Sequence, residues 1–217
     1  MDIRAVIFDM DGVLIDSEYV YLSNTCRGLR KKRPWIREQD LYPSVGMDSV
    51  RTRELMFRIA GEPLDNREFD RELEEIYKLS DHVSYPDMLY PEVEKVLKAL
   101  RKHGYKTALA SSSRMAVIRK VLEQCGLQEL FDYVVSGEQF RESKPNPEIY
   151  LTVMAAIGCR PEECLVVEDS TYGVKAGLGA GARVAARKDL RFPFDQSGAA
   201  YHIDTLEDVL EIIGIDE

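Results

Sequence analysis

The amino-acid sequence predicts an α/β fold: a doubly wound, Rossmann-like parallel sheet with an all-helical domain inserted after its first strand. Two observations predict the sheet. Short apolar runs recur along the chain, and amphipathic helical patterns alternate with them. A third observation predicts the insertion. One long interval near the start of the chain contains helical patterns and no convincing strand.

The predicted strands are uniformly apolar, which is typical of strands buried on both faces of a parallel sheet. They are Ala5–Phe8, Thr107–Ala110, Tyr133–Val135, Leu165–Val167 and Arg183–Ala186. Apolar residues at helical spacing predict the helices between them, and a glycine directly after the stripe is expected to end several of these helices. The stripes run over Val93–Leu100, Ile118–Cys125, Tyr150–Ile157 and Leu206–Ile213, the last with Asp204 or Thr205 as expected N-cap.

The interval from Asp16 to about Val83 holds helical patterns at Val20–Arg30, Thr52–Ala60 and Glu68–Leu79. A crossover needs only a short loop and one helix, so roughly 65 residues here are enough for a separate subdomain. We expect residues 1–16 and 84–217 to form the core domain around the sheet and residues 17–83 to form a separate helical domain. The insertion follows the first strand at the carboxyl edge of the sheet, where open α/β folds bind ligands, so we expect a lid.

Composition and charge narrow the class of protein. The 217 residues are 45% hydrophobic and 31% charged, as in globular proteins with a core, and the net charge of −9 argues against a nucleic-acid partner. No apolar run approaches ~18 residues and no signal peptide is visible, so we expect a cytoplasmic enzyme without a membrane partner. The cysteines lack metal-ligand spacing, which favours reduced core thiols. They are Cys26, Cys125, Cys159 and Cys164.

Two acidic pairs directly follow predicted strands. Asp9 and Asp11 follow the first strand, and Glu168 and Asp169 end the run CLVVED. The carboxyl ends of parallel strands meet at one edge of the sheet, and carboxylate oxygens that converge there suit Mg²⁺. Like charges so close repel unless a cation neutralises them. The structural alternatives are a solvated turn at the first pair and an N-cap from Asp169 or Ser170 at the second.

Two further strand ends carry groups that suit an anion. Ser111, Ser112, Ser113 and Arg114 follow the strand at 107–110, and their hydroxyl and helix-start N–H groups could bind a phosphate, although serine there is also ordinary capping. Lys144 precedes two prolines in SKPNPE. In a rigid turn beside carboxylates it would be a compact positive charge for phosphate and for a nucleophilic aspartate, whereas a lone lysine is usually solvated.

Read in order, DMDG, Ser111, Lys144 and Glu168–Asp169 resemble the four motifs of the haloacid dehalogenase (HAD) superfamily. The stretches FDMDGVLIDSE, SKPNPEIY and VVEDSTYGV are similar to its branch of phosphatases and β-phosphoglucomutases, and the resemblance covers nearly the whole chain. It implies a HAD core with a helical cap and Mg²⁺-dependent hydrolysis of a small phosphomonoester, such as a sugar phosphate, through an aspartyl-phosphate. The implied partner is a small phosphorylated metabolite, and the implied state is a monomer.

The resemblance also implies roles for individual residues. Asp9 would attack phosphorus, and Asp11 would protonate the leaving oxygen and then activate water. Ser111 would bind the phosphoryl group, and Lys144 would neutralise its charge. Mg²⁺ would be held by Asp9, the Asp11 backbone carbonyl, Glu168 and Asp169. Since Asp11 must be protonated for the first step, we expect its pKa to be raised.

Departures from the family pattern favour a phosphatase. In the family pattern that this chain resembles, β-phosphoglucomutases carry a histidine five positions after the equivalent of Asp16 and an arginine in the cap loop, three positions after its glycine. This chain has Tyr21 and Ser49 at these positions. A phosphosugar mutase is therefore the alternative. Arg51 and Arg53 lie nearby, but both fit equally well on the solvated face of a helix.

The cap loop Pro43–Ser49 is expected to contact the leaving group through Gly46, Met47 and Asp48. Trp35 could be a substrate platform, but packing within the cap is the favoured interpretation. The basic run Arg30–Arg33 is expected on a solvated helix end.

Other classes fit less well. A phospho-accepting receiver domain is shorter, lacks a cap and carries its acidic pair ahead of the acceptor aspartate. A non-catalytic binding protein on this fold would be expected to lose Asp9 or Asp11, and a haloacid dehalogenase lacks the second aspartate. Sugar phosphates, phosphoglycolate and nucleoside monophosphates are all compatible substrates.

Overall fold

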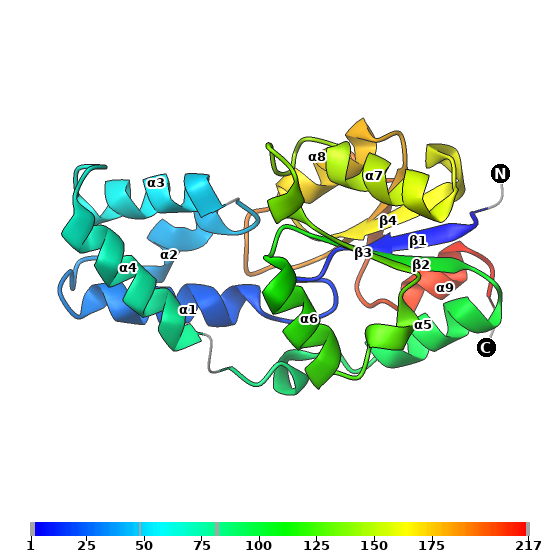
Figure 1. Ribbon diagram of the computed structural model, residues 1–217, viewed down its shortest axis with the longest axis horizontal. Helices are drawn as coiled ribbons and strands as arrows, with labels where there is room; N and C mark the ends of the chain where they lie inside the picture. Colours follow the sequence, from blue (N-terminus) through cyan, green and yellow to red (C-terminus); the bar gives the residue numbers. More distant parts are fainter. Residues whose placement is uncertain (1–2, 48, 81–82, 216–217) are drawn as a thin grey trace. The chain divides into compact units, whose positions relative to one another are not determined.

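The computed structural model describes residues 3–47, 49–80 and 83–215 and shows two compact units (Figure 1). The core unit comprises Met1–Asp16 and Tyr85–Glu217, and the cap unit comprises Ser17–Ser84. No helix in the described ranges is long and apolar enough to cross a membrane.

The core unit contains a six-stranded, fully parallel sheet in the order β3-β2-β1-β4-β5-β6. The strands are β1 Ala5–Phe8, β2 Lys106–Ser111, β3 Tyr133–Ser136, β4 Cys164–Glu168, β5 Arg183–Arg187 and β6 Tyr201–Ile203. The α/β, doubly wound prediction and its five strands are confirmed. The edge strand β6 was not predicted because it has three residues and only one of them is buried.

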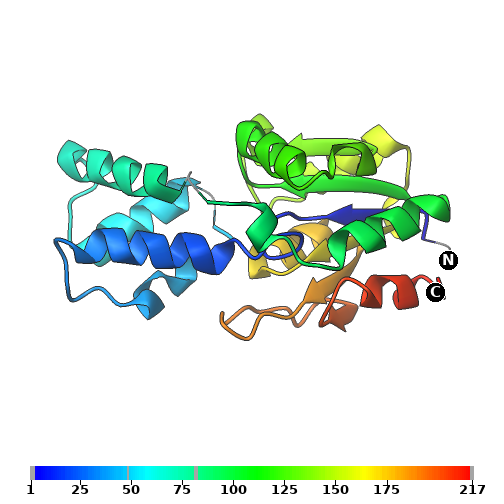
Figure 2. The same ribbon diagram turned by 90° about the horizontal axis from the view of Figure 1, so that it is seen from below.

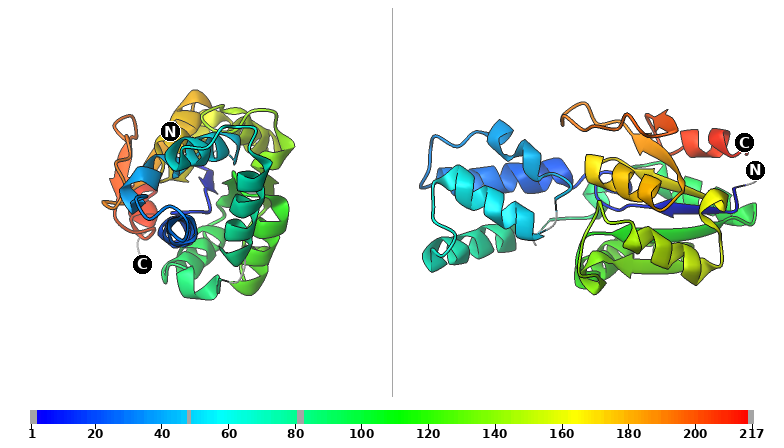
Figure 3. Two further views of the ribbon diagram at one scale, coloured as in Figure 1. Left: turned by 90° about the vertical axis from the view of Figure 1, so that its left-hand side faces the viewer. Right: turned by 90° about the horizontal axis from the view of Figure 1, so that it is seen from above.

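Helices cover both faces of the sheet, so the uniformly apolar strands are buried on each side. Figures 1 and 3 show α7 and α8 on one face, and Figure 2 shows α5 and α9 on the other. The longer helices are α5 Val93–Lys102, α6 Met115–Gln124, α7 Glu148–Ile157, α8 Thr171–Gly179 and α9 Asp208–Ile212. The short 3₁₀ turns are η2 Pro86–Met88, η3 Gln128–Leu130, η4 Gly137–Gln139 and η5 Pro161–Glu163.

The expected N-cap of the last helix is wrong. Helix α9 is preceded by Glu207, and Asp208 in its first turn reaches back to accept hydrogen bonds from the backbone N–H groups of Asp204 and Thr205, at 2.8 and 3.1 Å. The side chain of Asp208 thus binds the backbone of these two residues, and neither of them caps the helix.

The strand register positions the two acidic pairs. Phe8 of β1 lies opposite Val167 of β4, and the N–H of Asp9 donates to the Val167 carbonyl at 2.9 Å. Asp9 and Glu168 therefore leave adjacent strands at the same edge of the sheet. On the other side of β1, Phe8 lies opposite Leu109 of β2, so Ala110 and Ser111 end at that edge as well.

Helices are the only regular secondary structure among the described residues of the cap unit, and loops connect them. It contains α1 Glu18–Arg30, α2 Glu38–Leu41, η1 Tyr42–Ser44, α3 Ser49–Ala60 and α4 Arg67–Ser80. The aromatic rings of Phe57 and Phe69 meet edge to face with centroids 4.7 Å apart and form the centre of its core. The short helix α2 has no counterpart in the sequence prediction.

Two expectations for cap side chains are wrong, at Trp35 and at Arg33, whereas the rest of the basic run, Arg30 to Lys32, is exposed as expected. Trp35 is 64% exposed and does not pack, whereas the neighbouring Ile36 is buried. Arg33 is 8% exposed and pairs with two carboxylates, at 2.8 Å to Glu62 and 2.9 Å to Glu72. Arg53 is consistent with a solvated helix face, since 38% of its side chain is exposed, and its guanidinium binds both carboxylate oxygens of Asp70 at 2.6 and 2.7 Å.

We predict that Gly28→Ala destabilises the cap. Helices α1 and α4 pack so closely that a Cβ on Gly28 would lie 2.7 Å from both Cγ atoms of Ile76, a stiff β-branched side chain. The expected loss in the free energy of unfolding is about 1–3 kcal/mol, measured by urea unfolding. Ile76→Ala should relieve the clash in a double-mutant cycle, and the exposed neighbour variant Arg27→Ala should leave stability nearly unchanged. An additive cycle would contradict the steric explanation.

Candidate functional site

Three acidic side chains converge at the carboxyl edge of the sheet. Asp9 follows β1, Glu168 ends β4 and Asp169 comes next, and all three are buried. Each offers a carboxylate oxygen, and these oxygens lie within 4.8 Å of one another. We call Asp9, Glu168 and Asp169 the acidic cluster. The structure thus brings together three of the four residues that the sequence predicted as metal ligands.

Lys144 is buried inside the same site and is not a solvated surface lysine. Its Nζ donates at 2.6 Å to Asp9 Oδ1, at 2.6 Å to Glu168 Oε1 and at 3.0 Å to the backbone carbonyl of Ala110. The side chain is 5% exposed. One ammonium therefore spans β1, β2 and β4 and uses all three of its protons.

Tyr150 is a member of the site that the sequence analysis missed. Its hydroxyl donates to Glu168 Oε1 at 2.6 Å, and Lys144 Nζ lies 5.0 Å from the centre of its ring. Tyr150 falls in the apolar stripe of α7, and its ring packs there as expected. Nothing in the sequence pattern indicated that its hydroxyl would contact the acidic cluster. The other oxygen of Glu168 accepts from the N–H of Asp169 at 3.1 Å.

Burial dominates the electrostatics of this site. It raises the pKa of Asp9 to about 8, a shift that Lys144 opposes and that Glu168 and Asp11 reinforce. Burial alone would lower the pKa of Lys144, but the charges of Asp9 and Glu168 raise it well above its ordinary value. Three carboxylates and one ammonium, which contacts two of them, leave the ionised cluster with excess negative charge. An all-oxygen donor set of this charge fits a hard divalent cation such as Mg²⁺.

Two glycines let the backbone approach the acidic cluster. A Cβ on Gly12, whose φ is 77°, would lie 2.1 Å from Asp169 Oδ2, and a Cβ on Gly173 in α8 would lie 1.9 Å from the Glu168 carboxylate. The N-cap of α8 is Ser170, whose Oγ accepts from the Gly173 N–H at 3.0 Å. Of the two N-cap candidates at this strand end, the structure selects Ser170, so Asp169 is not required for capping.

The serine run after β2 lies beside the first acidic pair. Ser111 is fully buried, and its Oγ accepts from the Ser113 N–H at 3.0 Å. Ser113 Oγ donates to Asp11 Oδ2 at 2.9 Å, while Ser112 Oγ lies 3.4 Å from Ser143 Oγ. Because Ser111 Oγ accepts this bond, its own proton points elsewhere and could be donated to an anion. Arg114 is exposed at the N-cap position of α6.

Asp16 does not belong to the acidic cluster. Its carboxylate binds the guanidinium of Arg191 at 2.6 and 3.0 Å, and its N–H donates to the Met88 carbonyl at 2.8 Å. It is the last residue of the first core segment.

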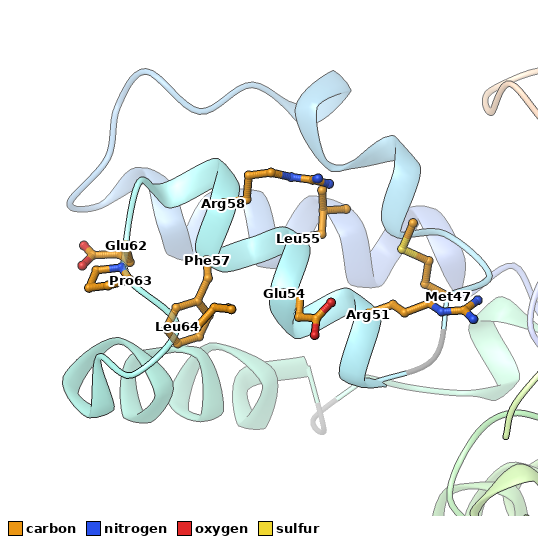
Figure 4. Close-up of a pocket in the computed structure, with 9 residues that line it drawn as sticks. All are labelled: Met47, Arg51, Glu54, Leu55, Phe57, Arg58, Glu62, Pro63 and Leu64. Carbon is orange, nitrogen blue, oxygen red and sulfur yellow. The ribbon is translucent and has the colours of Figure 1, made fainter. Parts of the chain in front are cut away.

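The predicted cap contacts lie in the other unit. Gly46, with a φ of 74°, and Met47 precede α3, whereas Asp48 lies outside the described residues. Met47 lines a cavity of about 610 Å³ along α3 (Figure 4). Its other lining residues are Arg51, Glu54, Leu55, Phe57, Arg58, Glu62, Pro63 and Leu64. Contact of Gly46 and Met47 with a substrate stays a prediction.

Comparison with known proteins identifies relatives. A model of the family described as haloacid dehalogenase-like hydrolase matches residues 3–181. Hexitol phosphatase B of Escherichia coli (strain K12) is 32% identical over 195 residues, covering 83% of this chain and 82% of the relative. Phosphoglycolate phosphatase of Aquifex aeolicus (strain VF5) is 29% identical over 187 residues, covering 84% and 83%.

Solved structures show the same fold. The crystal structure of β-phosphoglucomutase from Clostridium difficile superimposes with a TM-score of 0.81 at 22% identity, covering 98% of this chain and 96% of that one.

We predict that Gly173→Ala destabilises the protein by about 1–3 kcal/mol, because the new methyl group must displace the Glu168 carboxylate from Lys144 and Tyr150. Gly179→Ala on the same helix is the matched control. Its Cβ would meet Pro147 at 3.4 Å, an ordinary contact, so stability should fall little or rise. Urea unfolding of both variants measures the difference in the free energy of unfolding. An equal change in the two variants would show that the clash with Glu168 is not responsible for it.

Proposed function

The chain belongs to the haloacid dehalogenase-like hydrolase family, and we propose that it is a Mg²⁺-dependent phosphatase that hydrolyses a small phosphomonoester through an aspartyl-phosphate. Its enzyme class is phosphoric monoester hydrolase, the class of its named relatives. The observation that carries the proposal is the buried Lys144, which neutralises Asp9 within a cluster of carboxylates.

Mg²⁺ would be held by the carboxylates of Asp9, Glu168 and Asp169 and by the backbone carbonyl of Asp11. When bound, it would supply positive charge to a transferring phosphoryl group. Lys144 would supply a second positive charge, and the Ser111 hydroxyl and the N–H groups that open α6 would donate hydrogen bonds to the phosphoryl oxygens.

The chain's own residues account for each bond that changes. A carboxylate oxygen of Asp9 attacks phosphorus while the ester P–O bond breaks, and Asp11 gives its proton to the leaving oxygen. Asp11, now a carboxylate, takes a proton from the water that attacks the aspartyl-phosphate. Inorganic phosphate leaves and Asp9 is regenerated. Phosphoryl transfer depends on positioning and neutralised charge, which the rigid contacts of Lys144 favour.

A phosphatase is favoured over a phosphosugar mutase. Tyr21 in α1 and Ser49 at the start of α3 replace the histidine and arginine expected of β-phosphoglucomutases. The two relatives found by sequence are named phosphoglycolate phosphatase and hexitol phosphatase B, which supports a small sugar or acid phosphate as the proposed substrate class. β-Glucose 1-phosphate separates the two activities: a mutase forms glucose 6-phosphate, and a phosphatase releases inorganic phosphate.

The cap unit is proposed as the lid and as the source of contacts to the leaving group. We propose domain boundaries at 16/17 and 83/84, the second of which lies one residue before the division of the two units at 84/85. A cytoplasmic location and a monomeric state stay predictions from the sequence.

We predict that a panel of phosphomonoesters is hydrolysed with Mg²⁺ and not with EDTA, and that Asp9→Asn lowers kcat by at least ~10³-fold because the nucleophile is lost. Phosphate release measures the rates. The matched control is Asp204→Asn, which changes an aspartate with a 76% exposed side chain and should be as active as the unmodified protein. Activity that survives Asp9→Asn would overturn the proposed mechanism.

The raised pKa of Asp9 predicts pH-dependent metal binding. Burial raises this pKa to about 8, so below pH 8 the metal-free protein holds a proton that Mg²⁺ must displace. The apparent affinity should therefore increase by up to about tenfold per pH unit from pH 6 to 8 and level off above, with about one proton released per ion. Calorimetry in buffers of different ionisation enthalpy measures this release. Equal proton release in Asp9→Asn would assign the proton to another group.

A further inference from the structure

We propose that Ser113 is a positioning residue for Asp11, the acid and base of the proposed reaction. The sequence suggested that Ser113 contributes to a phosphate site. In the structure, however, its hydroxyl donates to Asp11 Oδ2 at 2.9 Å. The inference rests on the proposed function, and it concerns which side chain holds the proton donor in place.

The backbone of Ser113 is fixed from two strands. Its N–H donates to Ser111 Oγ, at the end of β2, at 3.0 Å, and its carbonyl accepts from Ser136 Oγ, at the end of β3, at 2.7 Å. Both of these serines are fully buried. The hydroxyl that reaches Asp11 is therefore attached to a segment whose donor and acceptor are both bound by rigid parts of the sheet.

The β3 side of this support is itself closely packed. Ser136 Oγ also accepts a hydrogen bond from the Glu138 N–H at 3.2 Å. The Ser136 hydroxyl therefore donates one hydrogen bond, to the Ser113 carbonyl, and accepts another. A Cβ on Gly137 would lie 3.1 Å from the Cα of Ser112, so the two loops touch through their backbones. Displacing Ser113 would require both loops to move.

A hydroxyl suits the task because it can donate or accept. Asp11 is a carboxylic acid when it protonates the leaving group and a carboxylate when it accepts a proton from water. The Ser113 hydroxyl can donate to the carboxylate and can also pair with the acid form, whereas an ammonium would favour the carboxylate alone. Threonine keeps this hydroxyl, and alanine removes it.

The test compares leaving groups. An alkyl phosphate has a poor leaving group that needs protonation, whereas p-nitrophenyl phosphate has a good one that needs little. We expect Ser113→Ala to lower kcat/KM, which reports the step that expels the leaving group, by about 10-fold or more for the alkyl ester and by less than about 3-fold for the nitrophenyl ester, without a loss that lies in KM alone. Ser113→Thr should restore the alkyl rate. Ser143→Ala is the matched control, since it removes a nearby hydroxyl without a contact to Asp11, and it should leave the ratio of the two rates unchanged.

An equal loss on both esters, or a loss confined to KM, would overturn the proposal and assign Ser113 to phosphate binding or to folding. Crystal structures of the unmodified protein and Ser113→Ala give an independent readout: the Asp11 carboxylate should change orientation in the variant, and an unmoved carboxylate would count against positioning. If the unmodified protein hydrolyses neither ester, the proposed function fails, and the two crystal structures still decide the role of Ser113.

Discussion

The buried contact of the Lys144 ammonium with Asp9 and Glu168 is the interaction on which the site depends. Adjacent parallel strands deliver carboxylates to one edge of the sheet, and without a cation they would repel one another and resist burial. Because the same ammonium also binds the Ala110 carbonyl of β2, it links the three central strands at the point where chemistry is proposed. Removing it would leave two buried charges uncompensated.

This constraint explains features that are otherwise unrelated in the sequence. The turn before helix α8 directs the Asp169 N–H at Glu168, so α8 begins next to this carboxylate and the residue that faces it is Gly173. The turn after β1 must pass Asp169, which Gly12 permits. Tyr150 completes the donors around Glu168. A carboxylate with this many donors is held in one orientation, which keeps Lys144 directed at Asp9.

The sequence predicts those parts of the structure that depend on local patterns. Buried parallel strands have a distinctive apolar composition, and polar residues at their ends must meet at one edge, so Asp9 and Glu168 could be assigned to one site. Lys144 lies well beyond the end of β3, and its motif in SKPNPE assigned it to the same site. Tyr150 could not be assigned to it, because its ring satisfies the helical stripe and its partner is on β4. The burial of Arg33 depends on Glu62 and Glu72, which lie far along the chain in other cap elements. Exposed Trp35 shows that residue size alone does not decide packing.

The two aspartates of DMDG, Asp9 and Asp11, differ in the chemistry of the group that donates a hydrogen bond to each carboxylate. Asp9 faces an ammonium, whose charge opposes the rise in pKa that burial causes and so favours the carboxylate that a nucleophile requires. Asp11 faces a hydroxyl, which can pair with either form, as a group that gives and then takes a proton requires. Sequence spacing makes the pair look equivalent, but the segment after β2 supplies Ser113 to one member and the SKPNPE turn supplies Lys144 to the other. The division of roles between two identical side chains therefore follows from the segments that surround β1.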